Sequence, residues 1–263
     1  MVEGMNVRRL VTRSISEISA LVSCARPPVQ GLRVLMYHAI GTPALDDRLG
    51  LYSLSVERFR RQMTLLSMWH HGKVVDLTKS ELANKGCRVA ITFDDGYLDN
   101  LEVAAPILTD LGLPFTVFVT SDFVRTSKSG FLTPATLRTL AELPGVRIGA
   151  HGATHIALSG CDDQTLKTEL RVSREYLEDI VGYQINTLAY PFGAADQRVK
   201  NAALEAGYDL GACSMAGINR SKRDPLLLAR TDIVSYDDTR TFLQKLNGDW
   251  DWYRWRTKDP ACL

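Results

Sequence analysis

Short apolar segments rich in β-branched and aromatic residues alternate with longer amphipathic segments along most of this 263-residue chain. The short segments have the length and composition of buried strands, and the longer ones have helical periodicity. Strands that alternate with helices form parallel βαβ units, which argues against a β-sandwich and a helical bundle. The strand-like segments are residues 33–38, 89–93, 115–120, 146–151, 187–192, 208–213 and 226–234.

Ionisable and polar residues stand at the carboxyl ends of several strand-like segments. They are His38, Asp94 with Asp95, His151, and the turn at residues 190–193. In a (β/α) barrel these ends converge on one face, where such folds build active sites, whereas an open sheet would scatter some of them. We therefore predict an α/β fold, a (β/α) barrel with about seven parallel strands.

Capping residues place the helices between the strands. Ser55 and Thr133 are suited to begin helices, and Gly112, Gly182 and Gly207 are suited to end them. The predicted helices cover residues 55–69, 98–111, 133–143, 162–181, 196–206 and 241–246.

The chain divides into three predicted regions. Apolar residues recur at helical spacing from Leu10 to Val22, so residues 1–30 are predicted to be an amphipathic helical extension. Residues 31–247 form the barrel, and residues 248–263 form a tail that contains W-D-W-Y-R-W-R. Such a tail suits packing on the barrel, peripheral membrane contact, stacking on sugar rings or a protein partner.

Charge and cysteine content limit the partners and the compartment. With 31 basic and 30 acidic residues the net charge is +1, so no global field attracts nucleic acid, and no nucleic-acid partner is expected. The 5 cysteines are widely spaced without a C-x-x-C pair, which fits reduced thiols. With no visible export signal or membrane span, we expect a cytoplasmic location, with the inner membrane face as the alternative.

Two adjacent carboxylates stand at the end of the strand in V-A-I-T-F-D-D-G-Y, residues 89–97. Burying both as anions is unfavourable unless a cation, a shared proton or solvent relieves their repulsion. Asp94 and Asp95 therefore indicate a cation site, and an ordinary solvent-facing Asp-Gly turn is the alternative.

A pair of histidines follows another strand, in H-G-A-T-H at residues 151–155. Histidines four residues apart can point to one side of a helical turn and bind one metal through two imidazole nitrogens. With one carboxylate, His151 and His155 would make a three-ligand site. Surface histidines are the alternative.

Three motifs together resemble the polysaccharide deacetylase family, carbohydrate esterase family four. They are T-F-D-D-G at 92–96, H-G-A-T-H at 151–155 and Y-P-F-G at 190–193, and L-M-Y-H at 35–38 is similar to the opening of the exopolysaccharide-deacetylase branch. The resemblance covers residues 33–236 and implies a distorted (β/α) barrel, which agrees with the strand pattern.

The resemblance also implies roles for individual residues. Asp95, His151 and His155 would hold a divalent metal, and Zn²⁺ suits two imidazoles and one carboxylate. The metal would polarise the acetamide carbonyl and lower the pKa of water, and Asp94 would be the general base. The backbone N–H of Phe192 would stabilise the tetrahedral oxyanion.

The sequence departs from the family pattern near these motifs. Gly152 stands where the family often has Ser or Thr, which predicts the loss of a hydrogen bond that steadies the loop. Ala189 stands where many members carry an arginine that orients the base. Arg230 is a candidate to take over that role, and Asp232 is a candidate for the usual acidic partner of that arginine.

The general acid is the largest departure. Histidine is absent after His155, so the chain lacks the Leu-x-His element that supplies the acid in many members. His38 is the replacement that its strand-end position favours. One of the metal histidines is another candidate, and a core histidine hydrogen-bonded in place is the alternative reading of His38.

These observations predict a metal-dependent hydrolase that removes an N-acetyl group from an amino sugar in a glycan or glycan precursor, as in surface polysaccharide biosynthesis. The substrate would be an N-acetylated sugar, a glycan or a lipid-linked sugar. A deacylase of another amide, such as a formyl-sugar, would use the same residues. A catalytically inactive sugar-binding barrel is the second alternative.

Overall fold

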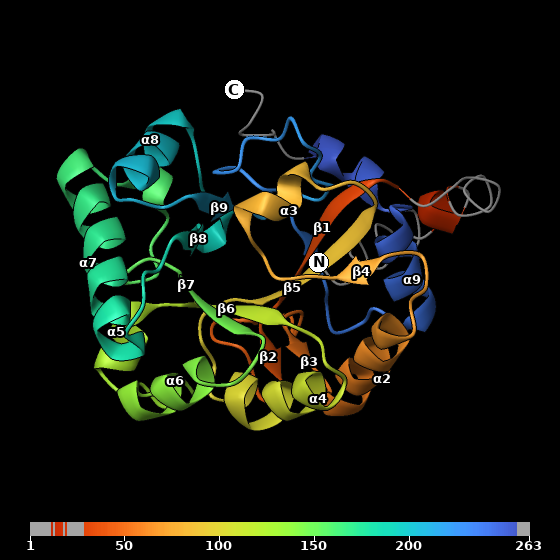
Figure 1. The fold of residues 1–263 in the computed structure, drawn as a ribbon, viewed down its shortest axis with the longest axis horizontal. Helices are drawn as coiled ribbons and strands as arrows, with labels where there is room; N and C mark the ends of the chain where they lie inside the picture. Colours follow the sequence, from red (N-terminus) through yellow and green to blue (C-terminus); the bar gives the residue numbers. More distant parts are fainter. Residues whose placement is uncertain (1–11, 13, 18, 20–28, 257–263) are drawn as a thin grey trace.

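A curved parallel sheet forms the centre of the molecule, and helices surround it (Figure 1). The computed structural model describes residues 12, 14–17, 19 and 29–256, apart from the side chains of Trp255 and Arg256. The strands of the main sheet follow the order β10-β1-β5-β6-β7-β8-β9, and β4 pairs with the start of β5. They are β1 (Gly31–Tyr37), β4 (Lys73–Val74), β5 (Cys87–Phe93), β6 (Phe115–Val119), β7 (Val146–Ala150), β8 (Thr187–Ala189), β9 (Leu210–Ala212) and β10 (Thr231–Asp232).

The segment 226–232 brings the two edges of the curled sheet together. Leu228 forms a parallel bridge with Ala212 of β9, and three residues later Thr231 of β10 pairs with Leu35 of β1. The sheet is therefore a nearly closed barrel, and the predicted fold class is confirmed. Of the predicted strand over residues 226–234, only Thr231–Asp232 forms β10, because the segment pairs first with β9 at Leu228 and then with β1 at Thr231.

The longest pairing in the barrel joins β1 to β5. Their seven residue pairs run from Gly31 with Cys87 to Tyr37 with Phe93, and every residue of both strands is buried. Strands covered on both faces read as mainly apolar runs, and here Arg33 and Arg88 are the buried charged exceptions. This register places His38 beside Asp94 at the carboxyl edge, where the Asp94 N–H donates to the Tyr37 carbonyl at 2.9 Å.

The helices lie around the outside of the sheet (Figure 1). They are α2 (Val56–Ser67), α3 (Lys79–Ala83), α4 (Ala105–Asp110), α5 (Ser121–Arg125), α6 (Pro134–Ala141), α7 (Asp163–Val181), α8 (Gln197–Glu205) and α9 (Thr239–Asn247). The predicted caps are present: Ser55 accepts from the Arg58 N–H, Thr133 forms a capping box with Thr136, and Gly182 ends α7 at φ 77°.

Two further predicted elements differ from the structure. The segment 98–111 is not one α-helix, because the π-helix η1 (Asn100–Ala104) precedes α4. Pro106 lacks the N–H that an α-helix would need there, and the Ala105 N–H donates to the Asn100 carbonyl instead. The strand predicted over 187–192 ends at Ala189, and the 3₁₀ turn η3 (Pro191–Gly193) follows.

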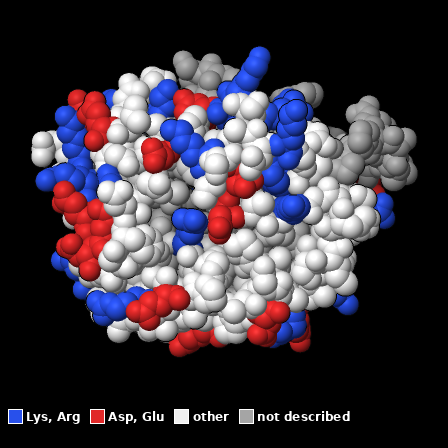
Figure 2. Space-filling view, viewed as in Figure 1, with Lys and Arg blue, Asp and Glu red and all other residues white. Residues whose placement is uncertain are grey.

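Short elements complete the structure. They are β2 (Ala39–Ile40), β3 (Ser53–Leu54), and the 3₁₀ helices η2 (Leu158–Gly160) and η4 (Asp251–Arg256). The strands β2 and β3 form a separate parallel pair beside the end of β1. Figure 2 shows lysines and arginines interspersed with acidic residues over one face of the molecule. Among the described helices, none combines the length and apolarity needed to cross a bilayer.

The described part of the predicted tail packs on the barrel. Asp251 forms two hydrogen bonds with Arg33, at 2.8 and 3.0 Å, and Trp250 donates to Gln244. Trp252 donates its indole N–H to Ser16, in a segment whose described residues are helical. The rest of the predicted N-terminal helix and residues 257–263 lie outside the described residues.

The Arg33–Asp251 pair should contribute to stability, because the Arg33 side chain is only 2% exposed. In an Asp251→Asn variant the buried guanidinium loses its counter-charge, and the free energy of unfolding should fall by about 2 kcal/mol. Denaturant unfolding measures this change. The control is Glu175→Gln, at an ion pair in which both side chains are at least 60% exposed, and it should cost less than about 0.5 kcal/mol. Equal effects of the two variants would contradict this role of the pair.

Candidate active site

Asp94 and Asp95 lie where β5 ends at the carboxyl edge of the barrel. Both are buried, at 2% and 8% exposure, so the alternative of a solvent-facing turn is wrong. Asp95 has φ 73° and Gly96 has φ 81°, a turn that sends the two carboxylates to different partners. A Cβ on Gly96 would lie 3.1 Å from a Val119 methyl, so a larger residue would press on β6.

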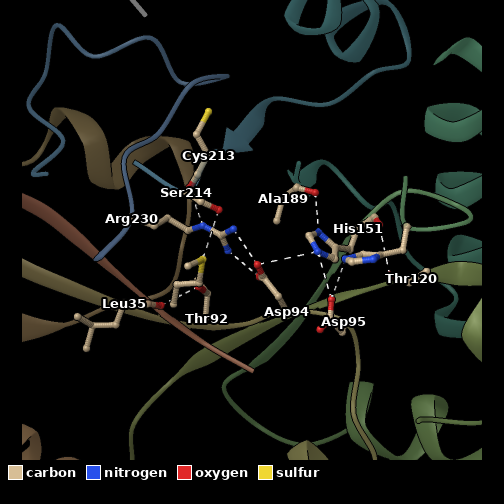
Figure 3. A network of polar contacts seen from close by, with 12 residues as sticks. Leu35, Thr92, Asp94, Asp95, Thr120, His151, Ala189, Cys213, Ser214 and Arg230 are labelled. Atoms are coloured by element: carbon tan, nitrogen blue, oxygen red, sulfur yellow. Dashed lines mark hydrogen bonds and ion pairs between the residues drawn. The ribbon is translucent and has the colours of Figure 1, made fainter. Parts of the chain in front are cut away.

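Arg230 holds Asp94 through a buried two-pronged ion pair. The Nη1 and Nη2 atoms of Arg230 donate to Oδ1 and Oδ2 of Asp94 at 2.6 and 2.8 Å, and its Nε donates to the Cys213 carbonyl at 2.9 Å (Figure 3). Burial raises the pKa of Asp94, but the charge and hydrogen bonds of Arg230, together with the nearby His151 and His38, outweigh burial and lower the pKa. Asp94 is therefore a carboxylate with a fixed plane at neutral pH.

Arg230 and Asp232, the candidates for the orienting arginine and its acidic partner, have different contacts in the structure. Arg230 contacts the predicted base, as its suggested orienting role requires. The carboxylate that Arg230 binds is that of Asp94 itself. Asp232 lies on β10, where its carbonyl accepts from Lys245 Nζ at 2.8 Å.

Asp95, His151 and His155 come together beside this ion pair. Asp95 Oδ1 lies 3.4 Å from His151 Nε2 and 3.2 Å from His155 Nε2. One ligand atom from each residue lies within 4.8 Å of the other two, a spacing that suits three ligands of one ion. The three residues that sequence reasoning selected from distant segments thus form one cluster.

The backbone fixes the ring orientation of His151. Its Nδ1 lies 2.8 Å from the Ala189 carbonyl, which only accepts, so Nδ1 carries a proton and Nε2 faces Asp95 (Figure 3). A histidine ligand whose other nitrogen donates to a carbonyl is typical of metal sites. Burial lowers the pKa of His151, but the Asp94 and Asp95 charges outweigh burial and raise it. A cation bound at His151 Nε2 would be attracted by the same two carboxylates.

The histidine pair does not lie on a helical turn, so that expectation is wrong. Residues 151–157 form a loop in which Gly152 has φ 71° and His155 has φ 61°. This loop, and not helical periodicity, brings the second imidazole to Asp95.

Glu169 of α7 anchors the histidine loop. Its carboxylate accepts from the Ala153 N–H at 2.8 Å, the Thr154 N–H at 3.0 Å and the Thr154 hydroxyl at 2.6 Å. These bonds steady the loop that Gly152 was expected to leave unsupported. Sequence reasoning missed Glu169. The signal that could have found it is its position on the buried face of an amphipathic helix, which it shares with Leu166, Leu170 and Ser173.

Phe192 lies next to His155 on the turn that follows β8. Its ring centroid is 4.7 Å from that of His155, its side chain is 68% exposed, and its φ is 60°. A Cβ on Gly193 would lie 2.5 Å from the Ser214 nitrogen, so only glycine fits there.

Unfavourable backbone conformations concentrate at this site. Of five non-glycine residues with positive φ in the described chain, three are Asp95, His155 and Phe192. Such conformations persist where the surroundings enforce them, and they cluster at functional sites.

His38 lies next to the ion pair, at the end of β1. Its Nδ1 is buried and has no hydrogen-bond partner, and its ring centroid lies 4.5 Å from that of Tyr52. Burial lowers the pKa of His38, and the Asp95 and Asp94 charges oppose this only in part. The reading of His38 as a core histidine hydrogen-bonded in place leaves Nδ1 unexplained.

The fold and the site together define a hydrolase of the polysaccharide deacetylase type. Residues 82–211 match the family model described as polysaccharide deacetylase. The chain therefore carries a polysaccharide deacetylase domain, and the predicted resemblance is confirmed.

Individual relatives support this assignment. YxkH of Bacillus subtilis (strain 168), whose name assigns it to the polysaccharide deacetylases, is 26% identical over 217 residues, which cover 79% of this chain and 72% of YxkH. The polysaccharide deacetylase BC0361 from Bacillus cereus has a TM-score of 0.70 at 25% identity, covering 82% of this chain and 69% of that one. The Streptococcus pyogenes deacetylase PplD, in complex with acetate, shares the fold with a TM-score of 0.72 at 24% identity, covering 83% and 99%.

The position of Glu169 predicts an effect on metal affinity. Glu169→Gln places an amide N–H₂ against N–H donors of the loop, so the loop should lose its fixed form and Zn²⁺ affinity should fall about 10- to 100-fold. Competition with a chromogenic chelator measures the affinity. Glu175→Gln, on the exposed face of the same helix, should leave it unchanged. Equal affinities of the Glu169→Gln variant and the unmodified protein would show that the loop does not depend on this carboxylate.

Proposed function

We propose that this protein is a metal-dependent hydrolase that removes the N-acetyl group from an amino sugar in a glycan or glycan precursor. The observation that carries the proposal is the placement of the Arg230-bound Asp94 carboxylate beside the Asp95, His151 and His155 cluster. One group suited to accept a proton thus lies next to three groups suited to hold a cation.

Asp95, His151 and His155 would hold the ion, for which Zn²⁺ fits the two nitrogens and one oxygen. A bound divalent ion supplies Lewis acidity that polarises the acyl carbonyl and lowers the pKa of water. Asp94 would accept the proton of the attacking water. Because a carboxylate has about four acceptor positions, the two bonds from Arg230 leave Asp94 able to accept another proton.

Two further residues would complete the reaction. The backbone N–H of Phe192, on the strained turn beside His155, would donate to the oxyanion of the tetrahedral intermediate. His38 would protonate the departing sugar nitrogen, since its buried Nδ1 has no partner in the protein. The same residues would serve another deacylation, such as that of a formyl-sugar.

The substrate would be an N-acetylated sugar, a glycan or a lipid-linked sugar. Incubating the protein with a panel of such compounds, and with formyl-sugars, with and without a chelator, should give a mass loss that depends on the metal. Mass spectrometry of the products distinguishes acetyl from formyl release. Turnover that survives complete metal removal would contradict the proposal.

Asp94→Asn distinguishes an enzyme from a sugar-binding barrel. The amide keeps the size of the side chain but cannot accept the proton, so kcat should fall about 10²- to 10⁴-fold. Zn²⁺ content, measured by mass spectrometry of the metal, should stay the same because Asp95 and the histidines are unchanged. Retention of the deacetylation rate would end the role of Asp94 as base.

His38→Gln tests the general acid through the leaving group. Hydrolysis of an N-acetyl sugar should slow about a hundredfold, because an amine must be protonated to leave. Hydrolysis of 4-nitrophenyl acetate should change by less than about threefold, because 4-nitrophenolate leaves without a proton. An equal loss on both substrates would assign His38 a purely structural role.

A further inference from the structure

Asp99 is a buried carboxylate that the proposed reaction does not use. It is 3% exposed and stands directly before the π-helix η1, in the segment that follows Asp94 and Asp95. A buried carboxylate needs hydrogen-bond donors or a counter-charge, because its transfer out of water is otherwise unfavourable. The donors that surround Asp99 therefore indicate what the residue does.

These donors come mainly from the segment that follows His38. Oδ2 of Asp99 accepts from the Ile40 N–H at 2.9 Å and from the Thr42 hydroxyl, and Oδ1 accepts from the Asn100 amide at 3.0 Å. Burial raises the pKa of Asp99 to about 6, although these hydrogen bonds lower it, so above this pH Asp99 is a carboxylate. An ionised acceptor strengthens its hydrogen bonds to the segment.

Asp99 serves the edge of β2 that faces away from β3. The Ala39 and Gly41 N–H groups donate to carbonyl oxygens on the β3 side, at 3.1 and 2.8 Å. Because the N–H groups of a strand alternate between its two edges, the buried Ile40 N–H points to the other edge and needs an acceptor there. Asp99 supplies that acceptor. The short strand after His38 is therefore held on both edges.

Asn100 holds the backbone of His38 itself. Its Nδ2 donates to the His38 carbonyl at 3.1 Å as well as to Asp99. On the other side of His38, the Tyr37 carbonyl accepts from the Asp94 N–H at 2.9 Å. The orientations open to a side chain depend on its backbone, so these contacts limit where the imidazole can lie.

We infer that Asp99 is a positioning residue for the proposed general acid. Together with Asn100, it fastens residues 38–42 to the segment that follows the two aspartates, so that the His38 imidazole stays beside Asp94. Proton transfer requires the acid at a fixed place next to the reacting atoms. This inference rests on the proposed function and on His38 as its acid.

A comparison of two substrates tests this role. Asp99→Asn keeps the size of the side chain but turns an N–H₂ group toward N–H or O–H donors, so residues 38–42 should lose their hold. In the Zn²⁺-loaded full chain, kcat should fall about tenfold at unchanged KM, on the N-acetyl sugar of the panel that the wild type hydrolyses fastest. Hydrolysis of 4-nitrophenyl acetate should change by less than about threefold, because 4-nitrophenolate leaves without a proton.

A double-mutant cycle shows whether Asp99 acts through His38. In the His38→Gln background, Asp99→Asn should slow deacetylation by less than about twofold more, because the imidazole that Asp99 positions is then absent. Zn²⁺ affinity, measured by competition with a chromogenic chelator, should stay unchanged in Asp99→Asn. A further tenfold loss in the double variant would overturn the positioning role.

Hydrogen exchange follows the held segment without any substrate. The amides of residues 39–42 should exchange about tenfold faster in Asp99→Asn than in the wild type, because the Ile40 N–H loses its acceptor. The control is Glu102→Gln, at an exposed position on η1, which should change neither the exchange nor kcat.

Variants of Thr42 test the same contact from the other side, and they do so without any change at Asp99. Thr42→Val keeps the shape of the side chain but lacks the hydroxyl that donates to Asp99, so it should show part of the loss on the N-acetyl sugar. Thr42→Ser keeps the hydroxyl and should keep the wild-type rate.

The outcomes separate this inference from the proposed function. An equal loss on both substrates in Asp99→Asn, or a lower Zn²⁺ affinity, would assign Asp99 a purely structural role and leave the deacetylase standing. A wild-type kcat in Asp99→Asn would also overturn the positioning role alone. Equal slowing of both substrates by His38→Gln would overturn the acid assignment together with this inference. A wild-type protein that hydrolyses no N-acetylated sugar would overturn the proposed function as well.

Discussion

The site depends on the buried ion pair between Arg230 and Asp94. Arg230 belongs to the segment that joins the two edges of the barrel, and Asp94 ends the strand that pairs with β1 over its full length. A buried guanidinium and a buried carboxylate are each costly alone, and each satisfies the other here. The orientation of the proposed base is therefore tied to the closure of the barrel.

The barrel provides rigid strand ends, and short strained turns adapt them to chemistry. Three residues at these strand ends have positive φ: Asp95 after β5, His155 in the loop after β7, and Phe192 in the turn after β8. The Ala189 carbonyl and the Glu169 carboxylate then fix the ring of His151 and the loop that carries His155. Support from β8 and α7, which carry no proposed catalytic group, thus positions the candidate metal ligands.

The departures from the family pattern involve residues that lie at the same carboxyl edge of the barrel as the motifs that fit the pattern. An arginine can reach the base from position 230 as well as from the position of Ala189, because both lie near the carboxyl edge of the barrel. His38 likewise lies near Asp94, at the end of β1. Function therefore depends on where the guanidinium and the imidazole lie around Asp94, and not on their positions in the sequence.

The sequence by itself determined the alternation of strands and helices, most helix caps and the three metal-ligand candidates. These follow from local periodicity, capping chemistry and residue types at strand ends, none of which needs a distant partner. Only the tertiary structure decided that Arg230 binds Asp94 and that Glu169 anchors the histidine loop. These contacts join residues far apart in the chain, and the local pattern around each is compatible with a plain surface or core role. The helical turn expected for His151 and His155 was wrong for the same reason, since a loop held from α7 overrides their spacing.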